Sequence, residues 1–305
     1  SAIKINTIFL RDFINEPNVL TRPEFLRLLS QTVYLIGVTG THGKTSTTAL
    51  LAHIFKFNGI NISYIYGGVT SFNGIGGHYG DENLPLLLET DEAFNTFKEL
   101  EINSLLITNI DHDHIDHFGS YTNLVEAFGT VITNVKDKCV INIDDTKLST
   151  FLRPGDISYS SSKNSYYKIN FPNSFNVDKE DYTITTKLIG EHFISNIVGA
   201  IALANQNGIS IDQCLNAIKH FDGVKRRTEY IGDFNGTNFY DDYGHHPTEI
   251  KATTKALKNN TSGKLIVIFQ PHRFTRTRDN YEDLRDSFDH SDFTLITDIY
   301  SAVEE

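Results

Sequence analysis

Hydrophobic runs alternate with amphipathic stretches along most of the chain, a pattern that predicts parallel strands joined by helices. The clearest unit is a strand at 34–38, a glycine-bearing turn, and a helix at about 44–57 that stops at Gly59. Further apolar runs predict strands at 62–66, 84–88, 105–108 and 140–143. Two helical patterns follow, near 194–206 and 211–221, each ended by a glycine.

Two regions depart from this series. At 166–188 the pattern changes to short alternating runs, which suggests a small antiparallel appendage. After Gly223 a second unit begins, with predicted elements at 239–241 (strand), from Pro247 (helix), 265–269 (strand), 281–288 (helix) and 293–297 (strand). This βαβαβ series stops at Glu305, which would leave an unfinished sheet with an exposed edge. We therefore predict an α/β fold with a mostly parallel central sheet flanked by helices.

Size and charge narrow the possible functions. A chain of 305 residues exceeds one average domain, so two packed units are expected. Lys and Arg number 27 against 38 Asp and Glu, and no block of like charge stands out, so no nucleic-acid partner is expected. No apolar run is long enough to cross a bilayer, and no signal sequence opens the chain. We expect a soluble cytoplasmic protein without membrane insertion; the oligomeric state is left open.

Rare residue types add two expectations. Cys139 and Cys214 lie in apolar segments without His or Cys at metal-ligand spacing, so we interpret both as reduced core thiols, with a structural or catalytic pairing as the alternative. The chain has no Met and starts at Ser1, which indicates a fragment. Modified methionines missing from the sequence would be the other explanation.

The strongest local motif lies between the first strand and its helix. It consists of Gly40, Thr41, His42, Gly43, Lys44 and Thr45. In this position backbone N–H groups and the positive helix end can face a phosphate, while Lys44 neutralises charge and the Thr45 hydroxyl can ligate Mg²⁺. A tight strand-to-helix turn with a capping Thr is the alternative. The motif departs from the general P-loop pattern, because Val38 stands where a Gly is usual.

Two polar segments follow later apolar runs. The acidic segment 89–92 comes at the end of a predicted strand, where a carboxylate would point into the ligand crevice and suit Mg²⁺. The segment 109–117 contains several His and Asp residues and could contribute one ligand to a Mg²⁺–nucleotide site. A solvated loop is the alternative for both, and a structural zinc site is a further one for 109–117.

These motifs, in this order and spacing, resemble the central ATPase domain of the Mur ligase family. The resemblance implies a P-loop-type sheet domain followed by a partial Rossmann-like domain, with ATP and Mg²⁺ as cofactors. It implies that Lys44 contacts the β/γ phosphates, that Thr45 and Glu89 hold one Mg²⁺, and that His114 ligates a second. His192 and Asn196 would lie near adenine, although Phe193 stands where the family usually has Asn.

Two later segments, 241–249 and 269–277, are similar to the branch of the family that adds L-alanine. The resemblance implies that Arg227 reaches the phosphates and that Asp242 hydrogen-bonds the ribose. The residues that would line the pocket for the amino acid and the muramoyl carboxylate are His245, His246, His272, Arg273 and Arg276. Charge at a helix N-terminus is the alternative for 241–242, and a solvated helix start paired with Asp279 and Glu282 is the alternative for the arginines.

The implied organisation is a connector at 1–30, an ATP-binding domain at 31–223 and a partial amino-acid-binding domain at 224–305. The N-terminal UDP-binding domain of the family would be absent. The implied reaction joins L-alanine to UDP-N-acetylmuramate through an acyl phosphate in peptidoglycan precursor synthesis. Two alternatives remain open: a sister ligase that recycles murein tripeptide, and a non-catalytic nucleotide-binding fragment.

Overall fold

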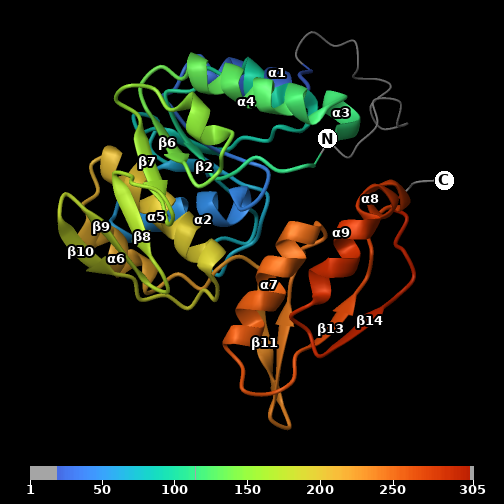
Figure 1. The fold of residues 1–305 in the computed structure, drawn as a ribbon. Coiled ribbons are helices and arrows are strands. Elements are labelled where there is room, and N and C mark those ends of the chain that lie inside the picture. The colour runs from blue at the N-terminus through green and yellow to red at the C-terminus, as the bar shows by residue number, and fades with distance from the viewer. Residues whose placement is uncertain (1–18, 114, 303–305) are drawn as a thin grey trace.

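A large sheet forms the centre of the protein in the computed structural model, which describes residues 19–113 and 115–302 (Figure 1). Its ten strands run in the order β10-β9-β8-β7-β6-β5-β1-β4-β2-β3. The strands are β1 (Leu35–Thr39), β2 (Ser63–Ile65), β3 (Gly77–His78), β4 (Leu86–Glu89), β5 (Ser104–Ile107), β6 (Cys139–Asn142), β7 (Ile157–Ser160), β8 (Tyr167–Asn170), β9 (Ser174–Val177) and β10 (Glu180–Thr183). Every pairing from β8 to β2 is parallel, which confirms the predicted mostly parallel sheet, although the strands β7 and β8 were not expected to belong to it.

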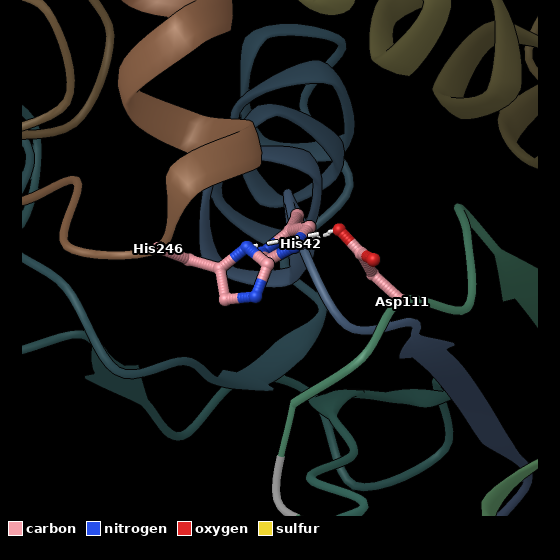
Figure 2. A group of neighbouring side chains, drawn as sticks. All are labelled: His42, Asp111 and His246. Atoms are coloured by element: carbon pink, nitrogen blue, oxygen red, sulfur yellow. Dashed lines mark hydrogen bonds and ion pairs between the residues drawn. The ribbon is translucent and has the colours of Figure 1, made fainter. Parts of the chain in front are cut away.

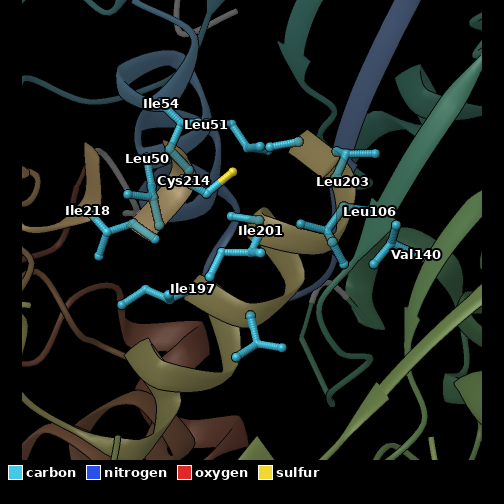
Figure 3. Close-up of a cluster of buried hydrophobic side chains, with 14 of the residues drawn as sticks. Leu50, Leu51, Ile54, Leu106, Val140, Ile197, Ile201, Leu203, Cys214 and Ile218 are labelled. Atoms are coloured by element: carbon cyan, nitrogen blue, oxygen red, sulfur yellow. The ribbon is translucent and has the colours of Figure 1, made fainter. Parts of the chain in front are cut away.

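Helices cover both faces of this sheet. They are α1 (Arg22–Ser30), α2 (Lys44–Phe57), α3 (Ile115–Phe118), α4 (Tyr121–Asn134), α5 (Glu191–Gln206) and α6 (Ile211–Ile218), with 3₁₀ turns η2 (Ala93–Glu99) and η3 (Leu148–Phe151). Because successive strand residues point to opposite faces, Ile36 and Val38 join the core under α2, α5 and α6, while Leu35 joins the core under α1 and α4. Figure 3 shows the first core, where side chains of these helices meet Leu106 and Val140 of the sheet.

The predicted antiparallel appendage is an extension of the main sheet. β8 pairs in parallel with β7, and β9 and β10 then add antiparallel strands at its end. Strand β7 was not expected from the pattern, because its run is short and interrupted by polar residues. Cys139 and Cys214 are buried and free, which confirms them as core thiols.

The C-terminal region packs beside the carboxyl end of the sheet (Figure 1). It contains β11 (Glu229–Phe234), β12 (Thr237–Asp241), α7 (Pro247–Asn259), β13 (Ile266–Phe269), α8 (Phe274–Asp279), α9 (Tyr281–Arg285), η4 (Asp286–Phe288) and β14 (Phe293–Ile296). β11 and β12 form a hairpin, which the sequence pattern did not reveal, and β13 pairs in parallel with β14. The strand predicted at 239–241 therefore pairs with β11 and not with β13.

One face of the β13–β14 pair is apolar and open to solvent. Ile268 is 72% exposed and Leu295, its partner in the register, is 59% exposed. The opposite face supplies Phe269 and Val267 to a small core with Ile250 of α7 and Leu284 of α9. In the described part of the chain, no helix is both long and apolar enough to cross a membrane.

Candidate active site

The loop between β1 and α2 follows a path that only glycine permits at two points. Gly40 has φ +132°, and a Cβ there would lie 2.1 Å from the Thr108 hydroxyl oxygen. Gly43 has φ +84°, and a Cβ there would lie 2.7 Å from the amide nitrogen of Asn196 on α5. Both glycines therefore let the loop lie directly against β5 and α5.

Asn109, just after β5, holds this loop from the side. Its carbonyl accepts from Thr41 N at 2.9 Å, its side-chain oxygen accepts from His42 N at 2.9 Å, and its amide donates to His42 O at 3.0 Å. Thr108 Oγ1 also donates to His42 O, at 2.7 Å. The loop conformation is thus held by residues at the end of the neighbouring strand β5.

Lys44 begins α2 and turns back over the loop. Its Nζ donates to Gly40 O at 2.7 Å and Thr41 O at 3.1 Å, and pairs with Glu92 at 2.8 Å. Burial alone would lower the pKa of Lys44, but the charges of Glu92 and Asp91 outweigh it and raise the pKa. Burial in turn raises the pKa of Glu92 against the attraction of Lys44. Because both Glu92 oxygens lie within 2.9 Å of Nζ, we interpret the pair as charged.

Thr45 and Glu89, the two residues predicted to share a metal ion, are in direct contact. Thr45 Oγ1 donates to Glu89 Oε1 at 2.7 Å, and Gly67 N donates to Glu89 Oε2 at 2.6 Å. Glu89 is the last residue of β4, which pairs with β1, so the carboxyl ends of two adjacent parallel strands bring these residues together. His114, the third predicted ligand, lies outside the described residues.

His42 lies between two carboxylates from different regions of the chain. Its Nε2 is 3.0 Å from Asp111 Oδ2, and its Nδ1 is 3.5 Å from Glu249 Oε1 on α7. Burial by itself would lower the pKa of His42, but the hydrogen bonds to Asp111 and Glu249 outweigh burial and raise the pKa to about 9. The same hydrogen bonds hold the pKa of both carboxyl groups below the usual range in spite of their burial.

A cavity of about 270 Å³ opens beside the loop, between α5 and α7. His42 and Gly43 lie on one side, His192, Phe193 and Asn196 on α5 form another, and Arg227, Thr228 and Asp242 close it from the C-terminal region. The structure therefore brings together His192 and Asn196, predicted to lie near adenine, Asp242, predicted to contact the ribose, and Arg227, predicted to reach the phosphates. Burial lowers the pKa of His192 to about 4 although Glu249 and Glu191 oppose the shift, so this wall is uncharged at neutral pH.

Asp242 shapes the C-terminal side of this cavity. Its Oδ2 accepts from Thr228 N at 2.7 Å and from Thr228 Oγ1 at 2.9 Å, and its Oδ1 accepts from Gly244 N at 2.6 Å. These bonds fix the turn that carries Arg227, whose guanidinium lies 3.5 Å from Glu249 and over the ring of Tyr243. The alternative interpretation of Asp242 as a charge at the start of α7 is not needed to explain its position.

A second and larger cavity, of about 1210 Å³, lies on the other side of Asp111. His246, Arg273 and Arg276 line it, together with Asp111 and Lys251. Of the remaining predicted residues, His272 supports Arg276 through a 3.2 Å contact to its guanidinium, and His245 lies 6.1 Å from His272 between ring centroids. Asp279 pairs with Arg278 and Glu282 with Arg285, so neither accounts for Arg276.

Four residues with clear contacts in the site were not singled out from the sequence. They are Glu92, Asn109, Asp111 and Glu249. Asn109 belongs to the polar segment that carries the family resemblance, although no role was predicted for it, and nothing in the sequence distinguishes Asp111 from its neighbours. Glu249 carried a local signal, because it stands three residues after His246 and completes a capping box at the start of α7.

Two models of known protein families match this chain. The model of the Mur ligase middle domain matches residues 38–204, which is more than half of the chain, and the model of the Mur ligase, glutamate ligase domain matches residues 226–303. The chain belongs to the Mur ligase family. The two matched segments correspond to the sheet domain with its β1–α2 loop and to the C-terminal region that faces it.

Individual members of the Mur ligase family are similar in sequence to most of this chain. The chain is 33% identical to the UDP-N-acetylmuramate–L-alanine ligases of Bradyrhizobium and Rhizobium etli, over 307 and 311 residues. These alignments cover 94% of this chain but only 66% and 65% of the relatives, so the chain spans about two thirds of their length.

Solved Mur ligases share the fold. The UDP-N-acetylmuramate-alanine ligase MurC of Thermotoga maritima is 28% identical, with a TM-score of 0.78 over 91% of this chain and 65% of that one. The MurF ligase of the same organism, solved in complex with ADP, is 18% identical, with a TM-score of 0.73 over 91% of this chain and 71% of that one. At that identity MurF supports the fold alone.

Proposed function

We propose that this chain is the ATP-handling core of a ligase that joins L-alanine to UDP-N-acetylmuramate in peptidoglycan precursor synthesis. The observation that carries the proposal is the convergence of three features at one end of the sheet: the β1–α2 loop, the Thr45–Glu89 pair and the cavity between α5 and α7. We assign residues 31–223 to ATP binding and residues 224–305 to part of the amino-acid-binding domain. The relatives named L-alanine ligases support the choice of substrate.

The loop suits a phosphate chain. The side chains give the N-terminus of α2 no cap, since Gly43 stands at the N-cap position, so the N–H groups of the first turn can face an anion. Lys44 is positively charged and adjacent. For Lys44 to contact the β/γ phosphates, Nζ would exchange part of its pairing with Glu92 for phosphate oxygens, which are equally strong acceptors.

Thr45 and Glu89 fit Mg²⁺. Both offer hard oxygen ligands, and their oxygens lie 2.7 Å apart. Adjacent ligands of an octahedral Mg²⁺ lie about 3 Å apart, given metal–oxygen distances of about 2.1 Å. A small separation of the two side chains would therefore admit the ion, which would neutralise charge on the phosphates.

The other predicted site residues would contact either ATP or the carboxylate-bearing substrate. His192 and Asn196 would contact adenine, Asp242 the ribose, and Arg227 the phosphates, since all four line the smaller cavity. Arg273 and Arg276 offer guanidinium groups to a carboxylate in the larger cavity, with His245, His246 and His272 nearby. Phe193, where the family usually has Asn, is buried and would give adenine an apolar neighbour in place of an amide.

The proposed reaction has two steps. The muramoyl carboxylate attacks the γ-phosphorus of ATP, which forms an acyl phosphate and releases ADP. The amine of L-alanine then attacks the acyl carbon, and phosphate leaves. Such chemistry requires mainly positioning and charge neutralisation. Arg227, which lines the smaller cavity, and Lys44, which follows Gly43 of its lining, would supply the positive charges.

Turnover of Mg-ATP tests the proposal. We expect ADP release that depends on L-alanine and on a high concentration of UDP-N-acetylmuramate, because the matched family models are those of the middle and glutamate ligase domains and the UDP-sugar should bind weakly. Lys44→Ala should abolish this release while the protein stays folded by circular dichroism. Lys56→Ala is the matched control, because Lys56 stands in the last turn of the same helix. Near-normal turnover in Lys44→Ala would contradict the assignment. Mg-ATP binding without turnover would favour the non-catalytic alternative for this chain.

The volume of the larger cavity keeps a second candidate open. About 1210 Å³ is more space than L-alanine needs and could accept a preformed peptide. The discriminating measurement compares L-alanine with L-alanyl-γ-D-glutamyl-meso-diaminopimelate as the amine substrate. Ligation of the peptide but not of L-alanine would replace the first candidate with the tripeptide-recycling activity.

A further inference from the structure

Three side chains from separate segments place metal-binding atoms close together (Figure 2). They are His42 in the β1–α2 loop, Asp111 after β5 and His246 at the N-cap of α7, and one ligand atom from each lies within 4.8 Å of the other two. His42 Nε2 is 3.0 Å and His246 Nδ1 is 3.7 Å from the same oxygen, Asp111 Oδ2. Ligand atoms of tetrahedral zinc lie roughly 3.3 Å apart, given bonds of about 2.0–2.1 Å.

The opposite ring nitrogen of each histidine has an acceptor of its own. His42 Nδ1 faces Glu249 Oε1 at 3.5 Å, and His246 Nε2 faces the carbonyl oxygen of His112 at 3.2 Å. Donation to the His112 carbonyl leaves the lone pair of His246 Nδ1 toward Asp111. His42 Nε2 gains a lone pair toward Asp111 once it gives up the proton that it shares with that carboxylate, while Nδ1 keeps its proton beside Glu249. Metal-bound histidines in proteins are held by this same kind of outer hydrogen bond.

Independent contacts agree with this assignment of the ring nitrogens. His246 Nδ1 accepts a hydrogen bond from Thr248 N at 3.3 Å, so this atom carries the lone pair. Asp111 is oriented by Thr248 Oγ1, which donates to Oδ2 at 2.5 Å, and by His112 N, which donates to Oδ1 at 2.7 Å. Contacts with Thr248 and His112 thus hold His246 and Asp111 beside His42, and a metal would take the lone pair of His246 Nδ1 in place of the long capping bond from Thr248 N.

The cluster is buried but reachable. The side chains of His246 and His42 are 5% and 13% exposed, whereas that of Asp111 is 28% exposed. Asp111 lines both cavities of the site, with His42 in the smaller one and His246 in the larger one. A fourth position at the metal would thus open toward solvent or substrate, as in sites with three protein ligands.

We propose that His42, Asp111 and His246 form a binding site for a divalent transition metal of the zinc type, which clamps the C-terminal domain to the nucleotide-binding loop. Two imidazoles and one carboxylate favour Zn²⁺ or Co²⁺ over Mg²⁺, which prefers oxygen ligands. The metal replaces the proton that His42 shares with Asp111. Because two ligands lie in the sheet domain and one on α7, the ion joins the two domains. This inference does not depend on the proposed ligase activity.

Metal titration of the tag-free, chelator-treated chain tests the proposal. We expect one Zn²⁺ per chain by competition with a chromophoric chelator, and the visible absorption of tetrahedral Co²⁺ when that ion is used. His42→Ala, Asp111→Asn and His246→Ala should each weaken Zn²⁺ binding by at least about tenfold, and Glu249→Gln by about tenfold through loss of the outer hydrogen bond. Each variant is first checked for a native unfolding transition.

Two controls separate this site from other metal binding. Glu89→Gln removes a ligand of the proposed Mg²⁺ site and should leave Zn²⁺ affinity unchanged, and so should His220→Ala, which removes an exposed histidine elsewhere. Bound Zn²⁺ should also raise the unfolding midpoint of the wild type but not of His246→Ala. Absence of stoichiometric Zn²⁺ binding, or equal affinity in the wild type and the three ligand variants, overturns the proposal.

Discussion

The Thr45 hydroxyl donates a hydrogen bond of 2.7 Å to Glu89, although 44 positions separate the two residues in the sequence. The contact exists because β1 and β4 are parallel neighbours whose carboxyl ends meet at one edge. It joins the first turn of α2, just after the β1–α2 loop, to the acidic segment on which the predicted metal site depends.

Replacing Thr45 tests this contact. Thr45→Val keeps the side-chain shape but removes the hydroxyl, so we expect the affinity for Mg-ATP to fall at least about tenfold, equivalent to about 1.4 kcal/mol. Thr45→Ser retains the hydroxyl and should bind nearly as the wild type does. Isothermal titration with and without Mg²⁺ provides the measurement. An equal loss for ATP alone and for Mg-ATP would argue against a metal role for this residue.

Gly40 offers a test of the loop conformation. Gly40→Ala introduces a Cβ at φ +132°, 2.1 Å from Thr108 Oγ1, so either the loop or β5 must move. We expect a loss of unfolding free energy of about 2–4 kcal/mol in urea titrations, from strain and steric overlap together. Gly59→Ala is the control, because Gly59 also has positive φ but has no heavy atom within 4 Å of the added Cβ. It should lose only about 1 kcal/mol.

Breaking the buried ion pair of Lys44 and Glu92 should reduce the free energy of unfolding more than breaking an exposed ion pair does. Glu92→Gln leaves the Lys44 ammonium without its carboxylate, and we expect a loss of stability of about 3 kcal/mol, as is usual when one partner of a buried pair is removed. The exposed pair Lys136–Glu101 is the control, and Glu101→Gln should change stability by less than about 1 kcal/mol. Similar losses for the two variants would show that Lys44 is better solvated than its burial indicates.

His192 should make stability fall in mild acid. Its folded pKa of about 4 lies below the ordinary 6.5, so between these values the unfolded chain binds a proton that the folded chain excludes. Stability is therefore complete above about pH 6.5 and is lost as pH falls toward 4, with a contribution of about 1–2 kcal/mol between pH 7 and pH 5. Urea titrations at both pH values should show a smaller acid loss for His192→Gln than for the wild type. His78→Gln, at an exposed position, should behave as the wild type does.

The sequence predicted the sheet domain better than the C-terminal region, for a physical reason. Strands buried on both faces, such as β1 and β5, are continuous apolar runs, and the helix that begins at Lys44 was predicted to the residue. β11 and β12 form an isolated hairpin with exposed residues, so no apolar pattern marks β11. The predicted extension at 166–188 was found, but its continuity with β7 depends on backbone pairing that side-chain patterns do not encode.

In the candidate site, some residues could be identified from sequence motifs, whereas others could be identified only from their contacts in the folded structure. Gly40 and Glu89 belong to motifs next to strand ends, so their places at the edge of the sheet could be predicted from the sequence. Glu92, Asp111 and Glu249 matter through contacts across the fold, and their importance became visible only when His42 and Lys44 were located in space.

We expect the exposed apolar face of β13 and β14 to cause self-association of the purified protein. Exposed isoleucine, leucine and phenylalanine on a short strand pair attract the same surface on another molecule, and open strand edges offer it hydrogen bonds as well. Light scattering should therefore increase with protein concentration and with kosmotropic salt. Assays at high concentration would then report on aggregates, so dilute samples are the appropriate starting point for every measurement above.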